Sequence, residues 1–512
     1  MAANYDIHRF ERLRPNKMAL FAMGLMLLAV AVSLFILSAL GGVFDNFQYL
    51  FLLPWVVALA VVIGIPLLAL YYKGEFHFGN PIVFASLSYF IPAFVVGGFL
   101  LAAGFSEPYF LSYIQDQEYN LPLTVALTGL GFSCLALGYF APVGTKLGGM
   151  VSKALPAADY SPTSFVLPGI ILLLLGIANT IFAFAVGLFG YQLPDQSSAY
   201  AGIIFLSTLF RLQGAFLLWL VIFRQRTFNT VSIALMVGLA TVDLVSALFA
   251  GNRGTILTVV TTVLFAYVFS GRKLGLRQGV FAGAVLSIGL MIGMIYGTTF
   301  RMVKGTETQQ SAGQYTENIF KTFDTVGRSD TYDNVSFGLT SLSERLDIVS
   351  TLAVVVSNHE QLKPYEEAYG IDNNIWVDTT TFLIPRVIWS EKPAASDPRN
   401  YSDLYFNTSE SSFAITPIGD LLRNYGIVGI AIGMFVLGMV IRFIYSALIT
   451  PGMTPIWKVT FYFMLITSVS YEGFFGTIVP TLYKVGFTAL VGILIVTFVA
   501  RKIDSAARPE RI

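Results

Sequence analysis

Residues 47–70 read FQYLFLLPWVVALAVVIGIPLLAL, and uncharged apolar runs of this kind decide the fold. About 20 apolar residues form a helix that crosses the roughly 30 Å hydrocarbon core of a membrane. The whole chain of 512 residues has the same character, since 55% of its residues are hydrophobic, 12% are charged and the mean hydropathy is +0.71. Average soluble chains carry about 25% charged residues. The sequence therefore predicts an integral membrane protein.

Twelve such runs are predicted to cross the membrane, which makes the expected fold class an all-α integral membrane protein. The runs cover Met18–Leu40, Phe47–Leu70, Pro81–Ala103, Leu121–Phe140, Phe165–Leu188, Ala201–Phe223, Thr230–Ala250, Thr255–Ser270, Val280–Thr299, Gly426–Leu448, Val459–Phe475 and Val479–Ala500. The eighth is short and the eleventh contains Glu472, so these two fit the pattern least well. The first run exceeds the roughly 7–15 apolar residues of a signal peptide and is expected to remain as a span.

Positive charge in the short loops predicts the orientation. Eighteen Lys and Arg residues lie on the side of the two termini, whereas the short loops of the other side hold only Arg253 and Lys484. Both termini are therefore expected in the cytoplasm. Residues 301–424 form the only long hydrophilic stretch, with ten basic and seventeen acidic residues, and are expected outside. The predicted parts are a nine-span bundle (1–300), this loop domain (301–424), and three spans with a cytoplasmic tail (425–512).

Two segments of the large loop have recognisable patterns. Apolar residues between Ser341 and Asn358 recur at the spacing of an amphipathic helix, and Asp372–Ile388 is rich in β-branched and aromatic residues, which favours an extended segment. A chain that only transports a solute has little use for so large an external loop. The loop therefore favours chemistry on a molecule that arrives at the outer leaflet.

Metal and redox sites find little support in the composition. Cys134 is the only cysteine, and His8, His77 and His359 are the only histidines. A disulfide within the chain is excluded, and neither a multi-cysteine nor a multi-histidine metal site is expected. No cofactor is predicted.

Two arginines in or beside the spans are candidate anion-binding residues. Arg211 lies near mid-membrane, where a charge is costly and often functional. Asp243 has a similar depth, so Arg211 either pairs with Asp243 to hold two helices together or binds an anionic headgroup in a polar cavity. Arg253 lies in the turn Gly251–Gly254, before a helix whose N-terminus faces outward. A diphosphate could be bound there by the glycine backbone, the helix N-terminus and the guanidinium group together. The alternative is an ordinary turn at the membrane interface.

The loop offers carboxylates and an aromatic, cationic string. Glu344 and Asp347 lie three residues apart and could deprotonate an acceptor hydroxyl, or could form an ordinary solvated face. The string Phe382–Pro393 contains Arg386, Trp389 and Lys392, which could bind sugar and phosphate or could anchor the loop at the membrane surface.

At these residues the sequence resembles the Wzy-type oligosaccharide repeat-unit polymerases, which are related to O-antigen polymerases and ligases. The resemblance extends from about Ser246 to Gly438. It rests on the turn Gly251–Gly254, the loop helix with Arg345, the Pro385-Arg386-x-x-Trp389-x-x-Lys392-Pro393 string, and the stretch Gly419–Gly426 with Arg423 before a span.

The resemblance implies a GT-C-like glycosyltransferase in the bacterial inner membrane. It implies that a glycan on undecaprenyl diphosphate is transferred to a hydroxyl of an incoming lipid-linked repeat unit at the outer leaflet. A flippase and a chain-length regulator are the expected protein partners, and nucleic acid is not. The leaving diphosphate would be stabilised by arginines that converge near the external membrane face, and a carboxylate would act as base. The implied catalytic residues are Glu344, Asp347 and Arg253, and the implied substrate-binding residues are Arg211, Arg345, Arg386, Trp389, Lys392 and Arg423.

Three rival functions remain open. A flippase or other transporter of lipid-linked glycans suits twelve spans, and a ligase that moves finished glycan to another acceptor shares the donor chemistry. A scaffold for an export complex would leave the buried and outer-turn arginines without a role.

Overall fold

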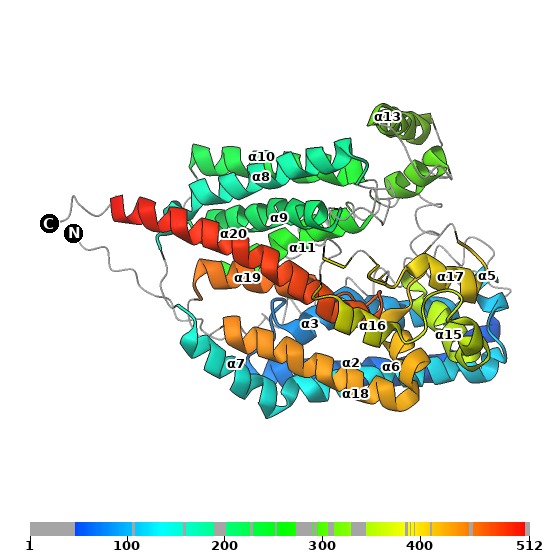
Figure 1. The fold of residues 1–512 in the computed structure, drawn as a ribbon. Helices are drawn as coiled ribbons and strands as arrows, with labels where there is room; N and C mark the ends of the chain where they lie inside the picture. The colour runs from blue at the N-terminus through cyan, green and yellow to red at the C-terminus, as the bar shows by residue number, and fades with distance from the viewer. Residues whose placement is uncertain are drawn as a thin grey trace.

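The computed structural model describes residues 47–104, 108–156, 160–188, 201–225, 229–250, 253–272, 289, 293, 295–305, 312–328, 345–384, 388–389, 391–393, 395–409, 412–449 and 454–506. These ranges contain helices and no strand (Figure 1). The helices are η2 (Phe47–Leu52), α2 (Leu53–Lys73), α3 (Pro81–Ala85), η3 (Ser86–Val96), α4 (Gly97–Ala102), α5 (Pro108–Ser112), α6 (Gln117–Phe140), α7 (Pro142–Ala154), η4 (Pro162–Phe165), α8 (Val166–Ala185), α9 (Ala201–Arg224), α10 (Thr230–Ala250), α11 (Arg253–Phe269), α13 (Ala312–Arg328), α15 (Ile348–Leu362), η5 (Lys363–Tyr365), α16 (Asn374–Thr381), α17 (Pro398–Phe406), α18 (Thr416–Leu448), α19 (Ile456–Thr467), η6 (Phe475–Thr477) and α20 (Ile478–Ala506).

Eight helical stretches of the described ranges are long and apolar enough to cross a membrane, so the chain is a multi-pass α-helical membrane protein. They correspond to eight of the twelve predicted spans: Gln48–Lys73, Pro81–Ala102, Gln117–Phe140, Pro162–Ala185, Gly202–Arg224, Thr230–Phe249, Thr416–Leu448 and Phe475–Ser505. The eighth and eleventh predicted spans correspond to the shorter apolar helices α11 and α19. The first predicted span and most of the ninth lie outside the described residues.

The helices form two groups with a pair between them (Figure 1). Helices α8, α9, α10 and α11 lie on one side, and α2, α3, α6, α7 and α18 lie on the other, with α19 and α20 between. The C-terminal end of α20 lies at one end of the bundle, and helices α5, α15, α16 and α17 gather at the opposite end.

Glycines let paired helices approach until their backbones touch. A Cβ atom on Gly138 of α6 would lie 1.9 Å from the Phe435 carbonyl oxygen, and one on Gly438 of α18 would lie 2.1 Å from the Leu135 carbonyl oxygen. In the other group, a Cβ atom on Gly176 of α8 would lie 1.9 Å from the Arg211 backbone nitrogen. Small residues at membrane helix interfaces commonly serve this purpose.

The loop helix was predicted as amphipathic, and the structure corrects this. Helix α15 begins at Ile348, and its residues are buried from Ile348 through Val356, on every side of the helix. It contacts α6, α17 and α18, so its apolar residues belong to the same hydrophobic cluster as the membrane helices. In the described ranges, α15 therefore forms the cap of the bundle rather than the surface of a separate domain.

The expectation of an extended segment over Asp372–Ile388 is also wrong for its first half. Residues Asn374–Thr381 form helix α16. A Cβ atom on Gly476 would lie 2.8 Å from the Ile375 Cα atom, which shows how closely α16 covers η6. Strand preference depends on packing partners, and here the partner is a helical turn.

Three membrane helices are interrupted. Residues Ser86–Val96 form a π-helix (η3) that contains Pro92, and α18 is broken at Gly426, which has φ 66° and ψ −162°. Helix α19 ends at Thr467, so the predicted span Val459–Phe475 is wrong beyond that residue. Both η3 and α18 contact α15, whereas α19 ends before it reaches that end of the bundle.

Candidate active site

The segment 468–477 joins α19 to α20 without regular helix until η6. The twelve residues of α19 rise about 18 Å, which is less than the roughly 30 Å of hydrocarbon that a span must cross. Figure 1 shows α19 toward the C-terminal end of α20, whereas the other end of α20 extends past α19 toward α16. Irregular backbone at membrane depth is tolerated only where protein buries it or where it lines a water-filled cavity.

Protein contacts satisfy much of this backbone. The Ser470 hydroxyl accepts hydrogen bonds from the backbone N–H groups of Glu472 (3.3 Å) and Gly473 (3.2 Å). The Glu472 carbonyl oxygen accepts one from the Thr416 N–H (3.2 Å), and the Gly476 N–H donates to Asp420 Oδ2 (3.2 Å). Long-range contacts with the start of α18 therefore hold the segment.

Side chains of the segment divide by exposure. Val469, Tyr471 and Phe474 are buried, whereas Ser470 and Glu472 are exposed. An ionisable residue within a membrane segment marks a functional site by default. The Glu472 carboxylate is thus accessible on a segment that regular helix does not occupy.

Thr416, which binds this segment, has a strained backbone. Its φ is 62°, a left-handed value that β-branched residues rarely adopt. Its hydroxyl accepts a hydrogen bond from the Gly419 N–H (3.1 Å) and so satisfies a donor in the first turn of α18. Strain of this kind, at about 1–3 kcal/mol, gathers at functional sites.

The π-helix η3 borders the same region. Tyr89 stacks on Tyr471 with ring centroids 5.9 Å apart, and Glu472 lies within electrostatic reach of Tyr89. The hydroxyl groups of Tyr89 and Ser86 are buried and have no hydrogen-bond partner in the described part of the chain. A buried polar group without a partner costs about 1–3 kcal/mol, so water or a ligand would stabilise both hydroxyls. Single π-helical turns are frequent at functional sites.

Next to Asp420 lies a buried ionic cluster centred on Arg423, which we call the Arg423 cluster. Arg423 contacts Glu366 Oε2 (2.9 Å) and Asp420 Oδ1 (2.9 Å), and it donates to the Ile371 carbonyl oxygen (2.7 Å) and to Asn374. The Tyr405 hydroxyl donates to Glu366 (3.0 Å). The cluster joins α16, α17, the segment after η5 and the start of α18.

Asp378 of α16 is a second carboxylate beside η6. Ser396 donates to it from its hydroxyl (2.6 Å) and its N–H (3.3 Å), and a Cβ atom on Gly476 would lie 3.3 Å from its Oδ2. Burial raises the pKa of Asp378, and the nearby Asp420 carboxylate adds to this, while Ser396 and Lys484 oppose it. A raised carboxylate pKa is typical of acid–base sites and also of structural clusters. Among the described residues, no group of three His, Cys, Asp or Glu side chains could hold a metal ion.

Apolar side chains cover the outside of α16 and the start of α20. Phe382 contacts Tyr483 with ring centroids 5.2 Å apart, and Lys484 is exposed beside them. Large exposed side chains surround this contact: Trp376, Leu383, Ile384, Ile388, Tyr483 and Phe487. Aromatic residues and a cation at the end of a span are typical of the membrane–water interface.

The predicted membrane arginines have separate surroundings. Arg211 of α9 binds Asp243 of α10 at 3.1 Å, which is the helix-pairing alternative of the sequence analysis. Arg423 lies in the other helix group, inside the Arg423 cluster. Arg211 and Arg423 therefore belong to different clusters, and the expected convergence of Arg211 with Arg253 stays a prediction.

Several predicted site residues lie wholly or partly outside the described part of the chain. Glu344 and Arg386 are outside it. Helix α11 begins at Arg253, close to the predicted helix start at Thr255. The structure describes the backbone of Arg253 but not its side chain.

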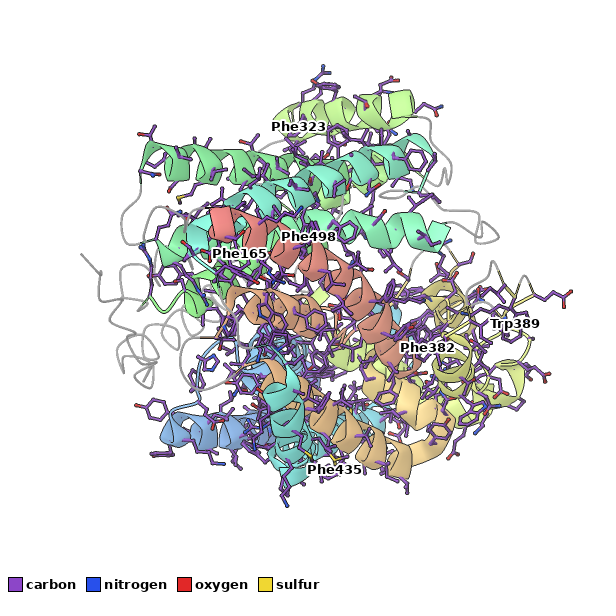
Figure 2. All side chains as sticks on the ribbon, turned by 60° about the vertical axis from the view of Figure 1, so that its left-hand side comes forward. Phe165, Phe323, Phe382, Trp389, Phe435 and Phe498 are labelled. Atoms are coloured by element: carbon purple, nitrogen blue, oxygen red, sulfur yellow. The ribbon has the colours of Figure 1, made fainter. Side chains whose placement is uncertain are left out.

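The remaining predicted residues occupy two places. Asp347 is fully buried and caps α15 by accepting from the Ser350 N–H (3.1 Å), which favours a structural role over that of a base; Arg345 just before it is exposed. Lys392 donates to the Ile384 carbonyl oxygen (3.0 Å) and shares a turn with Trp389. Figure 2 shows Trp389 at the outer rim and Phe382 nearer the membrane helices.

Sequence reasoning did not assign roles to Glu472, Asp378 or Lys484. The signal for Glu472 was present, because a carboxylate interrupted a predicted span. Lys484 was noted only as one of two outer cations. Nothing in the local sequence distinguishes Asp378 from the other sixteen acids of the loop, because its environment arises from η6 and Ser396.

Comparison with known families adds one result. Residues 167–448, more than half of the chain, match the model of a domain of unknown function, DUF8712. The chain belongs to the DUF8712 family. The match runs from α8 to the end of α18, and the segment 468–477 lies beyond it. No curated protein and no solved structure matches the chain.

Proposed function

We propose that this DUF8712 protein polymerises lipid-linked oligosaccharides at the outer leaflet of a bacterial inner membrane, with both termini in the cytoplasm. One observation carries the proposal: the exposed Glu472 carboxylate lies on a non-helical segment between α19 and α20, and the backbone of this segment is bound to the start of α18. A glycan on a lipid diphosphate presents its anomeric carbon close to the membrane surface. A carboxylate accessible near that level can meet an acceptor hydroxyl there.

In the proposed reaction the acceptor oxygen attacks the donor's anomeric carbon. The bond from that carbon to the diphosphate oxygen breaks, and Glu472 takes the proton of the acceptor hydroxyl. The departing diphosphate gains negative charge, which fixed cations stabilise most in a site that excludes water. Arg253 and Arg386 keep this role in the proposal, and the exposed Lys484 beside Asp378 joins them.

The neighbouring groups would hold the base in position. The Thr416 N–H binds the Glu472 carbonyl oxygen, and the Arg423 cluster fixes the first turns of α18 that carry Thr416. Tyr89, which stacks on Tyr471, offers a buried hydroxyl group beside the segment. These contacts support a preorganised carboxylate, which general-base catalysis requires.

The test replaces Glu472 with Gln in cells whose polymer depends on this chain. We expect chain extension to slow by about a hundredfold or more, because a positioned general base contributes at least that factor. The matched control is Glu317→Gln, which removes an exposed carboxylate of α13 and should leave polymer length unchanged. Arg253→Ala should likewise abolish polymer while the protein still folds. Long polymer in cells carrying either E472Q or R253A contradicts the assigned role.

A second candidate is a transporter of lipid-linked glycans. The π-helix η3, the break at Gly426 and the irregular segment after α19 favour it, because transporter sites are commonly built from discontinuous helices. Loss of a polymerase leaves single repeat units facing outward, whereas loss of a transporter leaves them inside. Labelling of single repeats by an impermeant reagent in E472Q cells separates the two functions. A ligase differs only in acceptor, and its loss would leave polymer length intact.

A further inference from the structure

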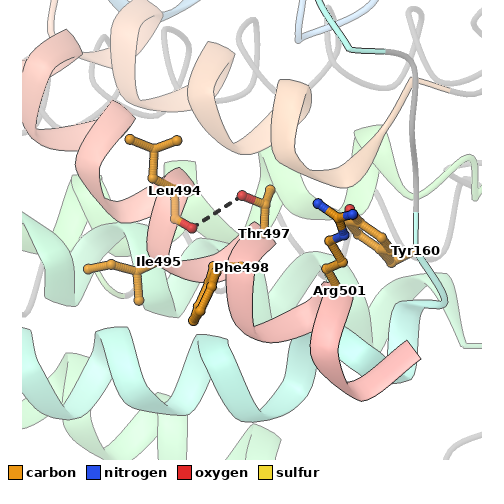
Figure 3. A pocket seen from close by; sticks show the side chains of 6 residues that line it. All are labelled: Tyr160, Leu494, Ile495, Thr497, Phe498 and Arg501. Atoms are coloured by element: carbon orange, nitrogen blue, oxygen red, sulfur yellow. Dashed lines mark hydrogen bonds between the residues drawn. The ribbon is translucent and has the colours of Figure 1, made fainter. Parts of the chain in front are cut away.

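A groove of about 580 Å³ lies along the C-terminal half of α20 (Figure 3). Its lining combines five residues of α20 with one residue from the connection between α7 and η4: Leu494, Ile495, Thr497, Phe498, Arg501 and Tyr160. Pockets for small ligands enclose roughly 300–1,000 Å³, so the groove is large enough for part of a lipid.

The groove continues a stripe of exposed apolar side chains along α20. Tyr483, Phe487, Leu490, Leu494 and Phe498 are all exposed, and their spacing of three or four residues puts them on one face of the helix. An apolar face along a membrane-spanning helix faces lipid. Near Leu494 and Phe498 the face therefore meets acyl chains rather than water.

Charge appears where the helix would leave the hydrocarbon. Arg501 follows Leu494 by seven residues, which is about 10 Å along the helix axis. Arg501 is exposed on α20. Lys502 adds a second cation, with its Nζ 4.6 Å from the Phe498 ring centroid. Figure 3 shows Tyr160 at the Arg501 end of the groove and Leu494 toward the other.

We propose that this groove binds an anionic phospholipid of the phosphatidylglycerol type from the leaflet on the side of the termini. The phosphate lies at Arg501, and one acyl chain lies along Leu494 and Phe498. Basic residues at the ends of spans attract anionic headgroups, and an aromatic residue such as Tyr160 suits the same depth. The groove shares no residue with the proposed transferase site, and the proposal does not depend on that activity.

The test is native mass spectrometry of the full chain, reconstituted with either phosphatidylglycerol or phosphatidylcholine. We expect one phosphatidylglycerol to be retained preferentially, and Arg501→Gln to weaken its binding about tenfold, because a charge-assisted phosphate contact is lost. Leu494→Trp keeps every charge but fills the apolar part of the groove, and it should weaken binding similarly. The matched control is Lys73→Gln, an exposed cation at the same membrane face that lies over Phe140.

Three outcomes would overturn the proposal. Equal retention of phosphatidylcholine would show that the groove does not select an anionic headgroup. Unchanged phosphatidylglycerol affinity in both R501Q and L494W would place the bound lipid elsewhere. Displacement of the lipid by glycerol phosphate at matched concentration would show that the site takes a soluble phosphate rather than a lipid.

Discussion

Arg211 and Arg423 are both guanidinium groups among apolar helices, yet they are neutralised in different ways. The Arg423 side chain is 0% exposed and meets two acids, Glu366 and Asp420, which are almost as deeply buried. The Arg211 side chain is 17% exposed and meets one acid, Asp243, through a single contact of 3.1 Å. The second oxygen of Asp243 is buried with no hydrogen-bond partner in the described part of the chain.

This difference distinguishes an arginine with a structural role from one that is still accessible to a further anion. A fully buried charge is tolerated only when paired and hydrogen-bonded, and both terminal nitrogens of Arg423 have carboxylate and hydrogen-bond partners, although its Nε atom has no hydrogen-bond partner in the described part of the chain. Arg211 makes one contact with a carboxylate and remains partly open, so a second anion can still approach it. The sequence resemblance implied a substrate-binding role for both arginines. The contacts of Arg423 are those of a structural cluster, whereas a role of Arg211 in substrate binding stays a prediction.

The largest effect should come from Arg423→Met. Two carboxylates would remain buried without their cation, and breaking a buried pair in this way costs about 3–5 kcal/mol. Unfolding of the purified protein in detergent, followed by heat or denaturant, measures the loss. Arg328→Met is the control, because it removes an exposed pair with Asp324 that contributes about 1 kcal/mol at most. An R423M protein as stable as the control would show that the cluster does not hold the loop helices.

Arg211→Met should have a smaller effect on stability. It leaves Asp243 without its partner, which costs about 1–3 kcal/mol, and partial exposure lets water compensate. The double variant R211M/D243N should recover part of the loss, because it removes the uncompensated acid. The same unfolding assay applies. A loss as large as that of R423M, with no recovery in the double variant, would remove the distinction between the two arginines.

The smallest effect concerns Asp378, a buried acid that no arginine neutralises. Its folded-state pKa is raised above the ordinary 3.8, chiefly by burial, so folding favours its protonated form. The free energy of folding that this group contributes is fully present below the ordinary pKa of 3.8. It is lost as the pH rises through the raised pKa of the folded state. Asp378→Asn stays neutral, so we expect its stability relative to wild type to increase from pH 4 to pH 7. A pH-independent difference between the two melting curves would contradict the raised pKa.

Much of the membrane architecture could be predicted, because apolar runs of about 20 residues leave few alternatives in lipid. The run Phe47–Leu70 and the observed span Gln48–Lys73 agree closely, and the contact between Arg211 and Asp243 is one of the two alternatives that their matching depths suggested. These features are determined locally or by depth alone.

The candidate site could not be predicted because its contacts are distant in sequence. Helix α19 ends at Thr467 since the following backbone binds Thr416 and Asp420, which lie more than fifty residues earlier. Helix α16 forms under η6 although its Thr-rich sequence favours strand. Asp347 and Glu344 looked equivalent as bases, and only the start of α15 gives Asp347 its role as a cap.

The close approach of α6 and α18 at their paired glycines should constrain the sequences of related proteins. Gly138 and Gly438 each touch the opposite helix's main chain, so any methyl group there would force the two backbones apart. DUF8712 proteins that keep this crossing must conserve a hydrogen at both sites, including Gly438, which falls inside the family match. Correlated loss of both glycines in a relative would mark a branch whose helices cross differently.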